Sequence, residues 1–311
     1  DMMGNTIHNW DMLERGYTMH HAISQDKQGN ILATVSKTSA KIANGKDVRI
    51  NDFIIMMDPE KGEILQEWDL VHMLDSARYG MTDYDLTSDP SAQSASNWAH
   101  NNGIVEWGDD YLATARYQGI FKFNKAGGIE WIISPHGYWR DKYLKLLLNP
   151  LHADGTPITD PEVIAGTKNC DDFEWPWGCH TAVPLPNGHI LYFNNGYGRN
   201  FKLDFTDRKN IYTCGIEYEV DEVNRTVRQV WQYGKERGAA YFTPARSGVQ
   251  YLEQTGNRLI CPGMSNVLSN GNRGARVTEV DPETQDVVFE LELEDAIYQR
   301  VYRMSLYPEN Q

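Results

Sequence analysis

The stretch HNNGIVEWGDDYLATAR, residues 100–116, recurs along the chain and decides its fold. The related segments are HAISQDKQGNILATVSK (21–37), HTAVPLPNGHILYFNNG (180–196) and GVQYLEQTGNRLICPGM (248–264). In each copy a glycine lies eight positions after the first residue, within a polar turn, and a β-rich run follows. Two alternating apolar runs joined by such a turn predict a β-hairpin. Repetition of the unit indicates an architecture built from equal parts.

A second hairpin is predicted after each of these segments. Its four copies are FIIMMDPEKGEILQEWDL (53–70), IFKFNKAGGIEWII (120–133), GIEYEVDEVNRTVRQVWQY (215–233) and RVTEVDPETQDVVFELEL (276–293). Two hairpins give four strands in each repeat, which is the composition of a propeller blade. The sequence therefore predicts an all-β fold, a β-propeller to which this chain supplies four complete blades.

The opening residues extend the pattern. Residues 4–12, GNTIHNWDM, align with residues 62–70, GEILQEWDL, and Trp10 falls over Trp68. This alignment predicts the last strand of a preceding blade, so we expect one propeller domain over residues 1–311, truncated at its N-terminus. Two inserts, 72–99 and 137–179, are expected to lie over one face. The second contains WRDKYLKLLL, a predicted short helix.

Composition limits the partners. The 311 residues are 41% hydrophobic and 23% charged, which is typical of a globular protein. No stretch reaches the roughly 18 apolar residues of a membrane span. The formal net charge of −14 would repel nucleic acid and anionic membranes, so neither is an expected partner. An anionic substrate would need a local concentration of positive charge.

The cysteines do not form a CxxC pair, so the sequence does not indicate a tetrahedral zinc site. Cys170 and Cys179 lie close together in CDDFEWPWGC. They could close a short disulfide loop in an oxidising compartment, or all four cysteines could be reduced and buried.

The candidate site comes from the first residue of each repeat. His21, His100 and His180 occupy it in three repeats and Gly248 in the fourth. Successive blades are related by rotation about one axis, so these histidines are expected to converge at one channel mouth. A structural role in closing a turn is the alternative, but such a role should be retained in every blade.

Positive charge lies in the same register. Eight residues after the repeat glycines come Lys37 and Arg116, both in repeats that carry a histidine. Together with the histidines, Arg116 predicts a site for a small anion suited to the planar fork of a guanidinium. The alternative for Arg116 is a surface ion pair with Glu106 or Asp110. His20 is expected to point to the opposite face of its strand from His21.

Three longer segments resemble the bacterial arylsulfate sulfotransferase family. They are SNWAHNNGIVEWGDDYLATARYQGIFKF (96–123), DDFEWPWGCHTAVPLPNGHILYFNNGYGR (171–199) and VRQVWQYGKERGAAYFTPARSGVQYL (227–252). The resemblance continues to the closing VYRMSLYP. It implies a six-bladed propeller, a periplasmic location, and sulfuryl transfer between phenols without a nucleotide donor.

The resemblance also implies roles for individual residues. His180 in WGCHTA corresponds to the family's nucleophile, which becomes transiently sulfated. His100, Asn102 and Arg116 correspond to its sulfate-binding residues, and a further family histidine falls on the His20–His21 pair, where the repeat register selects His21. Arg246 stands where the family has a threonine and would remain an anion donor. The Cys170–Cys179 pair would replace a family disulfide of different spacing.

The chemistry is consistent with these residues. A neutral imidazole can attack the sulfur of an aryl sulfate and divide the transfer into two steps. The remaining donors would stabilise the charge that develops. Small aryl sulfates and phenols are the expected partners, no cofactor is expected, and the sequence leaves a homodimer open. Tryptophans of the inserts could form an aromatic wall for the phenols or could be ordinary core: Trp98, Trp139, Trp175 and Trp177.

Two other classes of function remain open from the sequence. Three histidines on a propeller axis could hold zinc or copper, although a neighbouring arginine opposes a cation. The chain could also be a non-catalytic propeller that serves as a binding module.

Overall fold

The computed structural model describes residues 3–44, 47–78, 98–202, 206–264 and 266–295. The fold is mostly β, with four sheets that are antiparallel apart from the parallel pairing of β9 with β13. The strands of the first two sheets are β1 (Tyr17–Gln25), β2 (Ile31–Asn44), β3 (Asp47–Met57), β4 (Ile64–Asp69), β5 (Asn101–Trp107), β6 (Asp110–Ala115), β7 (Gly119–Phe123) and β8 (Ile129–Ile133). Those of the other two are β9 (Asn149–Leu151), β10 (His180–Pro184), β11 (Ile190–Asn194), β12 (Cys214–Asp221), β13 (Thr226–Tyr233), β14 (Gly248–Tyr251), β15 (Arg258–Cys261), β16 (Asn266–Val267), β17 (Arg273–Val280) and β18 (Val287–Glu294).

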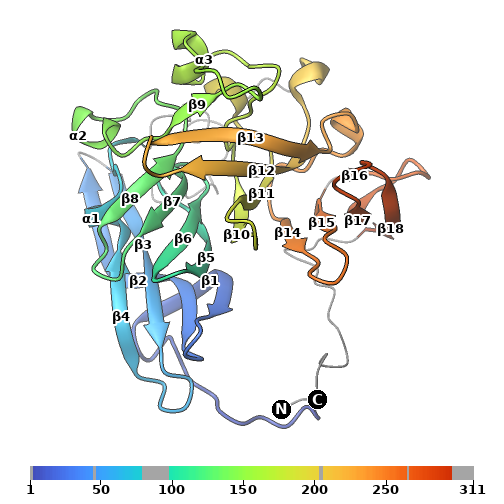
Figure 1. The fold of residues 1–311 in the computed structure, drawn as a ribbon. Helices are drawn as coiled ribbons and strands as arrows, with labels where there is room; N and C mark the ends of the chain where they lie inside the picture. The colour runs from blue at the N-terminus through green and yellow to red at the C-terminus, as the bar shows by residue number, and fades with distance from the viewer. Residues whose placement is uncertain (1–2, 45–46, 79–97, 203–205, 265, 296–311) are drawn as a thin grey trace.

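Both hairpins predicted for each repeat are confirmed. The first hairpins are β1–β2, β5–β6, β10–β11 and β14–β15, and the second are β3–β4, β7–β8, β12–β13 and β17–β18. The four sheets follow one another around an arc, with β1, β5, β10 and β14 toward its inside (Figure 1). These first strands also contact one another in sequence order. The repeated register therefore brings the start of each repeat to the centre of the molecule.

The hydrophobic core lies between successive sheets. Side chains alternate across a strand, so Leu112 of β6 packs toward the third sheet while Ala113 packs toward the first. In β11, Tyr192 faces back to the second sheet and Phe193 faces forward to the fourth. Each central sheet therefore buries both faces, which explains why β11 reads as an unbroken apolar run.

The insert of residues 137–179 adds small elements outside the second and third sheets (Figure 1). It contains α2 (Asp141–Leu144), β9 and α3 (Pro161–Ala165), and β9 pairs in parallel with β13. Helix α2 confirms the predicted short helix. A further short helix, α1 (Leu70–Met73), follows β4. Most of the other insert, residues 79–97, lies outside the described residues.

The predicted strand at residues 4–12 is wrong. These residues adopt bends, turns and irregular backbone, because the described chain offers them no neighbouring strand with which to form a ladder. Trp10 instead packs against the turn between β3 and β4. Its indole N–H donates to the Pro59 carbonyl at 3.0 Å, and Gly62 is close enough that an added Cβ would lie 2.6 Å from the ring.

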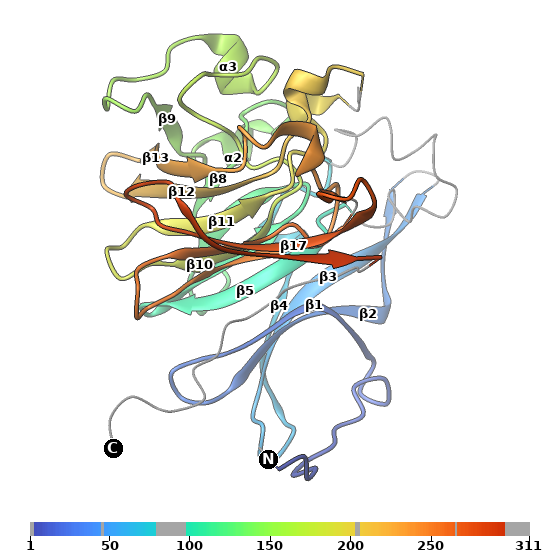
Figure 2. The ribbon, with the colours of Figure 1, turned by 90° about the vertical axis from the view of Figure 1, so that its right-hand side faces the viewer.

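No helix among the described residues has the length and apolar character needed to cross a membrane. Figure 2 shows the sheets from the side, with β17 and β18 of the fourth sheet facing the viewer.

Candidate active site

The three repeat histidines lie at irregularities in the first strands of their sheets. A register shift interrupts β1 between Met19 and Ile23, the start of β5 at Asn101, and β10 immediately after His180. His21 and His100 both have φ of 54°, in the left-handed region that a non-glycine residue seldom adopts. Such bulges turn a strand and redirect its side chains. Here they occur at the inner end of each repeat.

The structure brings these histidines together. Nε2 of His21 lies 3.0 Å from Nε2 of His100, and the ring of His180 is centred 6.4 Å from that of His21. The three residues are about 80 positions apart in the sequence and meet because the first strands of successive sheets contact one another. The convergence expected from the repeat is therefore found.

His20 differs from its prediction. It does not point away from His21, because the two Nδ1 atoms are 3.1 Å apart. The left-handed backbone at His21 breaks the strand alternation on which the prediction depended. His20 also lies 3.5 Å from the buried carboxylate of Asp52, whose other oxygen accepts the Asn101 N–H at 3.0 Å. The pair of adjacent histidines is therefore held beside the second sheet.

All three central imidazoles are held neutral. Removal from water lowers the pKa of His180 to about 3, with the Arg116 charge as the next contribution. The same loss of water, followed by the charge of His20, lowers the pKa of His21 to about 4, although His21 is the exposed member of the three. Burial and Arg116 also place the pKa of His100 well below its ordinary value. At neutral pH each ring therefore carries one proton and one lone pair.

Asn195 fixes which nitrogen of His180 carries the proton. The Asn195 side-chain nitrogen donates to the carbonyls of Thr243 and Arg246, at 3.0 and 3.1 Å. Its oxygen must therefore face His180, where it lies 2.6 Å from Nδ1. A carbonyl oxygen can only accept, so Nδ1 is protonated and the lone pair belongs to Nε2. Asn195 was not among the predicted site residues, although its place directly after β11 offered a signal.

Arg116 is buried beside the histidines and makes no ion pair among the described residues. One terminal nitrogen donates to the Pro244 carbonyl at 2.7 Å, the guanidinium lies 4.7 Å from the centre of the Tyr197 ring, and Nε has no hydrogen-bond partner. The surface ion pair is therefore wrong: Glu106 accepts the Lys27 N–H. A buried cation without a counter-ion is well suited to an anionic ligand.

The other alternative partner of Arg116, Asp110, instead pairs with Lys122. Lys37, the second cation of the repeat register, is occupied elsewhere, because its ammonium lies 2.6 Å from Glu67. The positive charge predicted for the site is therefore supplied by Arg116 and not by Lys37.

Asn102 ties the second sheet to the third. Its oxygen accepts from the Thr114 hydroxyl at 2.7 Å, and its nitrogen donates to the Cys179 carbonyl at 2.8 Å. The predicted sulfate contact of Asn102 stays a prediction, since both polar groups are engaged within the protein. The contacts give it a positioning role, because Cys179 immediately precedes His180.

Arg246 is exposed and has φ of 65°. Its carbonyl accepts from Asn195, and its charge contributes to the lowered pKa of His21. The residue therefore lies near the histidine cluster, close enough for its charge to act on His21. Direct binding by this side chain stays a prediction.

The tryptophans of the inserts belong to the core and do not form an open wall. Trp98 and Trp139 pack between the first two sheets, while Trp175 and Trp177 pack between the second and third. Trp177 also borders a small cavity that extends along Arg116. The aromatic residues that the prediction missed beside this cavity are Tyr117, Tyr197 and Phe201.

Of the two alternatives left open for Cys170 and Cys179, the disulfide is not formed. All four cysteines are free. Cys179 is buried with its thiol directed to the Ala115 carbonyl at 4.0 Å, whereas the Cys170 thiol lies 3.1 Å from Asp172. The two thiols have separate partners because the intervening segment, residues 173–178, packs its aromatic residues into the core.

The three-histidine metal hypothesis also loses support. Among the described residues, the group whose ligand atoms all lie close enough to share one ion is His152, Cys170 and Asp172. The central histidines do not form such a group, and the Arg116 charge contributes to the lowered pKa of all three. Their surroundings favour an anion over a cation.

Fold and site together define a β-protein with neutral imidazoles around a buried guanidinium. The chain belongs to the arylsulfotransferase (ASST) family, whose model matches residues 1–303. It is similar to the Arylsulfate sulfotransferase AssT of Escherichia coli O6:H1, with 29% identity over 339 residues, covering 98% of this chain and 56% of that protein. The AssT of Lelliottia amnigena is 29% identical over 338 residues with the same coverage. The chain thus spans about half the length of the curated relatives it matches.

Two solved structures are distant in shape. A putative 6-phosphogluconolactonase from Bacteroides uniformis has a TM-score of 0.38 and 11% identity, covering 93% of this chain and 77% of its own. A europium-containing methanol dehydrogenase has a TM-score of 0.37 and 10% identity, covering 89% of this chain and 49% of its own. Neither likeness bears on function.

Proposed function

We propose that this chain carries the active site of an arylsulfate sulfotransferase that moves a sulfuryl group from an aryl sulfate to a phenol. The observation that carries the proposal is the His180 imidazole, which is held neutral with its proton on Nδ1 and lies beside the buried Arg116. A neutral nucleophile beside an unpaired cation matches an anionic electrophile. The family match supplies the substrate class.

In the first step, the Nε2 lone pair of His180 attacks sulfur, and the bond between sulfur and the phenolic oxygen breaks. The products are a phenolate and an N-sulfohistidine whose Nδ1–H still donates to the Asn195 oxygen. In the second step, the acceptor phenol attacks the same sulfur and gives its proton to His21 or His100, while the N–S bond breaks and returns the electron pair to Nε2. No nucleotide takes part in either step.

Arg116 and the other histidines have defined tasks in this scheme. The guanidinium would hold the sulfuryl oxygens through its unpartnered Nε–H and stabilise their charge. His21 and His100 would donate hydrogen bonds or transfer the phenolic proton. A bound sulfate offsets the Arg116 charge, which raises the pKa of a neighbouring imidazole and makes proton transfer easier.

We also propose that the chain contributes four blades to the six-bladed propeller of its family. Apolar side chains are exposed at both ends of the arc of sheets: Met19 and Ile23 on β1, and Val288, Phe289 and Leu291 on β18. Further sheets packed against these ends would bury them and close the ring. A periplasmic location follows the family resemblance and is part of the same proposal, as is the option of a homodimer.

The test is the release of nitrophenolate from p-nitrophenyl sulfate in the presence of phenol. We expect release by the chain, and incubation with donor alone should add one sulfuryl group to the intact mass. His180→Ala should abolish both signals. The control His72→Ala changes an exposed histidine outside the cluster and should leave both unchanged. Undiminished release by folded His180→Ala would show that another group is the nucleophile.

A further inference from the structure

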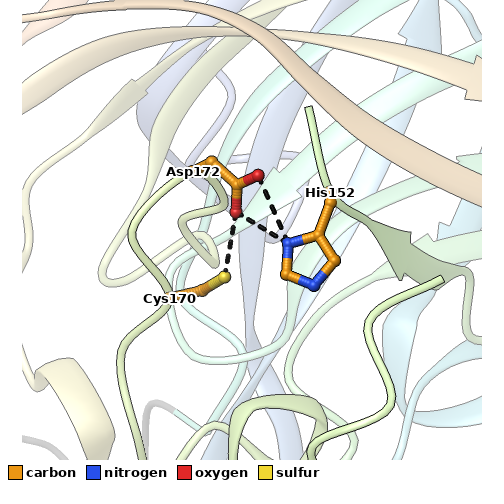
Figure 3. Close-up of side chains that lie close together, drawn as sticks. All are labelled: His152, Cys170 and Asp172. Carbon is orange, nitrogen blue, oxygen red and sulfur yellow. Dashed lines mark hydrogen bonds and ion pairs between the residues drawn. The ribbon is translucent and has the colours of Figure 1, made fainter. Parts of the chain in front are cut away.

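Three potential metal ligands meet in the insert of residues 137–179, outside the histidine cluster. His152 directly follows β9, and Cys170 and Asp172 lie in the loop between α3 and β10. Figure 3 shows the three side chains pointing toward one another. Their donor atoms all lie within 4.8 Å of one another: Nδ1 of His152, Sγ of Cys170 and a carboxylate oxygen of Asp172.

The contacts within this cluster are close. Nδ1 of His152 is 2.9 Å from Oδ1 of Asp172, and the Cys170 thiol donates to the same oxygen at 3.1 Å. The backbone holds Asp172 in place, since Oδ2 of its carboxylate also accepts the Ala153 N–H at 2.9 Å. Ligands fixed by neighbouring hydrogen bonds in this way are typical of metal centres.

We propose that His152, Cys170 and Asp172 bind a divalent transition metal, Zn²⁺ foremost, with water at the fourth position. Imidazole, thiolate and carboxylate are the three ligand types of zinc in proteins, and the thiolate disfavours Mg²⁺ and Ca²⁺. On binding, the Cys170 proton passes to solvent, the metal forms bonds to nitrogen, sulfur and oxygen, and waters leave the ion.

The present geometry needs little change to accept the ion. Bonds of about 2.0 to 2.3 Å in a tetrahedral site place the ligand atoms roughly 3.3 to 3.8 Å apart. The two measured contacts must therefore lengthen by less than about 1 Å. The His152 and Asp172 side chains are 39% and 36% exposed, so water and a metal ion can reach them.

A metal here would join two parts of the chain that support the third sheet. β9 pairs with β13, and the loop carrying Cys170 and Asp172 continues through residues 173–179 to His180, the first residue of β10. Fixing this loop to His152 would stabilise the segment that leads into the histidine cluster. This inference does not depend on the proposed sulfotransferase chemistry.

The experiment is a titration of the reduced, chelator-treated full chain with Co²⁺ and then Zn²⁺. We expect one equivalent to bind with a dissociation constant in the micromolar range or tighter, with thiolate-to-Co²⁺ charge-transfer absorption that Zn²⁺ abolishes. Cys170→Ser should lose this band and bind at least 100-fold more weakly. His152→Ala should weaken binding at least tenfold. The exposed control His72→Ala should bind like the parent.

Circular dichroism of each metal-free variant checks its fold, and Asp172→Asn provides a third ligand variant if Cys170→Ser does not fold. Zn²⁺ should also raise the Tm of the parent and not that of the ligand variants. The proposal is overturned if the dissociation constant of the parent exceeds about 100 µM, or if Co²⁺ binds without the thiolate charge-transfer band. It is equally overturned if folded ligand variants keep the parent affinity, or if His180→Ala alone removes binding.

Discussion

Replacement of Asn195 by alanine tests how the protein controls the His180 tautomer. The substitution removes the oxygen 2.6 Å from His180 Nδ1 and the two N–H donors to the Thr243 and Arg246 carbonyls. Among the described residues, the Gly178 carbonyl, 3.2 Å from Nδ1, then remains as a longer and weaker acceptor for the Nδ1 proton. The ring is therefore held less firmly and can rotate or place its proton on Nε2, where it blocks attack on sulfur. Loss of a preorganised group of this kind costs about 10²-fold in kcat, or about 2.7 kcal/mol of transition-state stabilisation.

The same substitution also affects stability. Two buried carbonyls lose their donors, and an unsatisfied buried group costs about 1–3 kcal/mol. A drop in Tm is therefore expected whether or not Asn195 acts on the reaction. The control Asn266→Ala removes an equally buried amide that donates to Pro262 at 2.9 Å and contacts no histidine. It should lower Tm comparably and leave kcat close to that of the parent.

The assay measures nitrophenolate release over a range of p-nitrophenyl sulfate concentrations, which separates kcat from KM. A positioning role predicts a fall in kcat with KM nearly constant, because sulfate binding by Arg116 is untouched. If Asn195→Ala and Asn266→Ala lose kcat equally, or if only KM changes in Asn195→Ala, the tautomer argument is refuted.

Three further predictions concern charge, pH and the core. Arg116→Lys should lower kcat/KM for p-nitrophenyl sulfate by about 10²-fold or more, because an ammonium cannot offer the planar fork, and an unaffected kcat/KM would contradict the proposed clamp. The pKa of His180 falls from 6.5 to about 3 on folding, so this residue contributes stability above pH 6.5 that is lost as pH falls toward 3. Urea unfolding of the parent and His180→Ala between pH 7 and pH 4 should therefore show a smaller loss of unfolding free energy in the variant. Parallel losses in the two proteins would count against a neutral His180. Phe193→Ala should destabilise the chain by about 3–5 kcal/mol, because the ring is fully buried between the third and fourth sheets. The same urea unfolding measures this change. A change below about 1 kcal/mol would mean that the interface between these sheets is not formed.

The hairpins and their order could be predicted because their signals are local. Alternating apolar residues and polar turns with glycine depend on near neighbours only, and the turns at Gly29, Gly108 and Gly188 require a positive φ that favours glycine. The segment at residues 4–12 carried the same pattern and formed no strand, because a strand also needs a partner that local sequence does not supply.

The histidine register predicted that distant residues would meet, but the sequence could not show how they are oriented. The left-handed backbone at His21 brings His20 to the same side, and Asn195 reaches His180 only because β10 and β11 bring them together. The free thiol of Cys170 likewise lies beside Asp172 and His152 and not beside Cys179. These contacts depend on packing that periodicity does not record.

The sequence by itself determined the repeating hairpins, the convergence of His21, His100 and His180, and the family, because a repeat in sequence becomes a rotation in space. Only the tertiary structure decided which nitrogen of His180 holds its proton, that all three rings are neutral, and that Arg116 lacks a counter-ion. Protonation and charge balance depend on burial and on atoms within a few ångströms, and those atoms come from parts of the chain that the sequence keeps far apart.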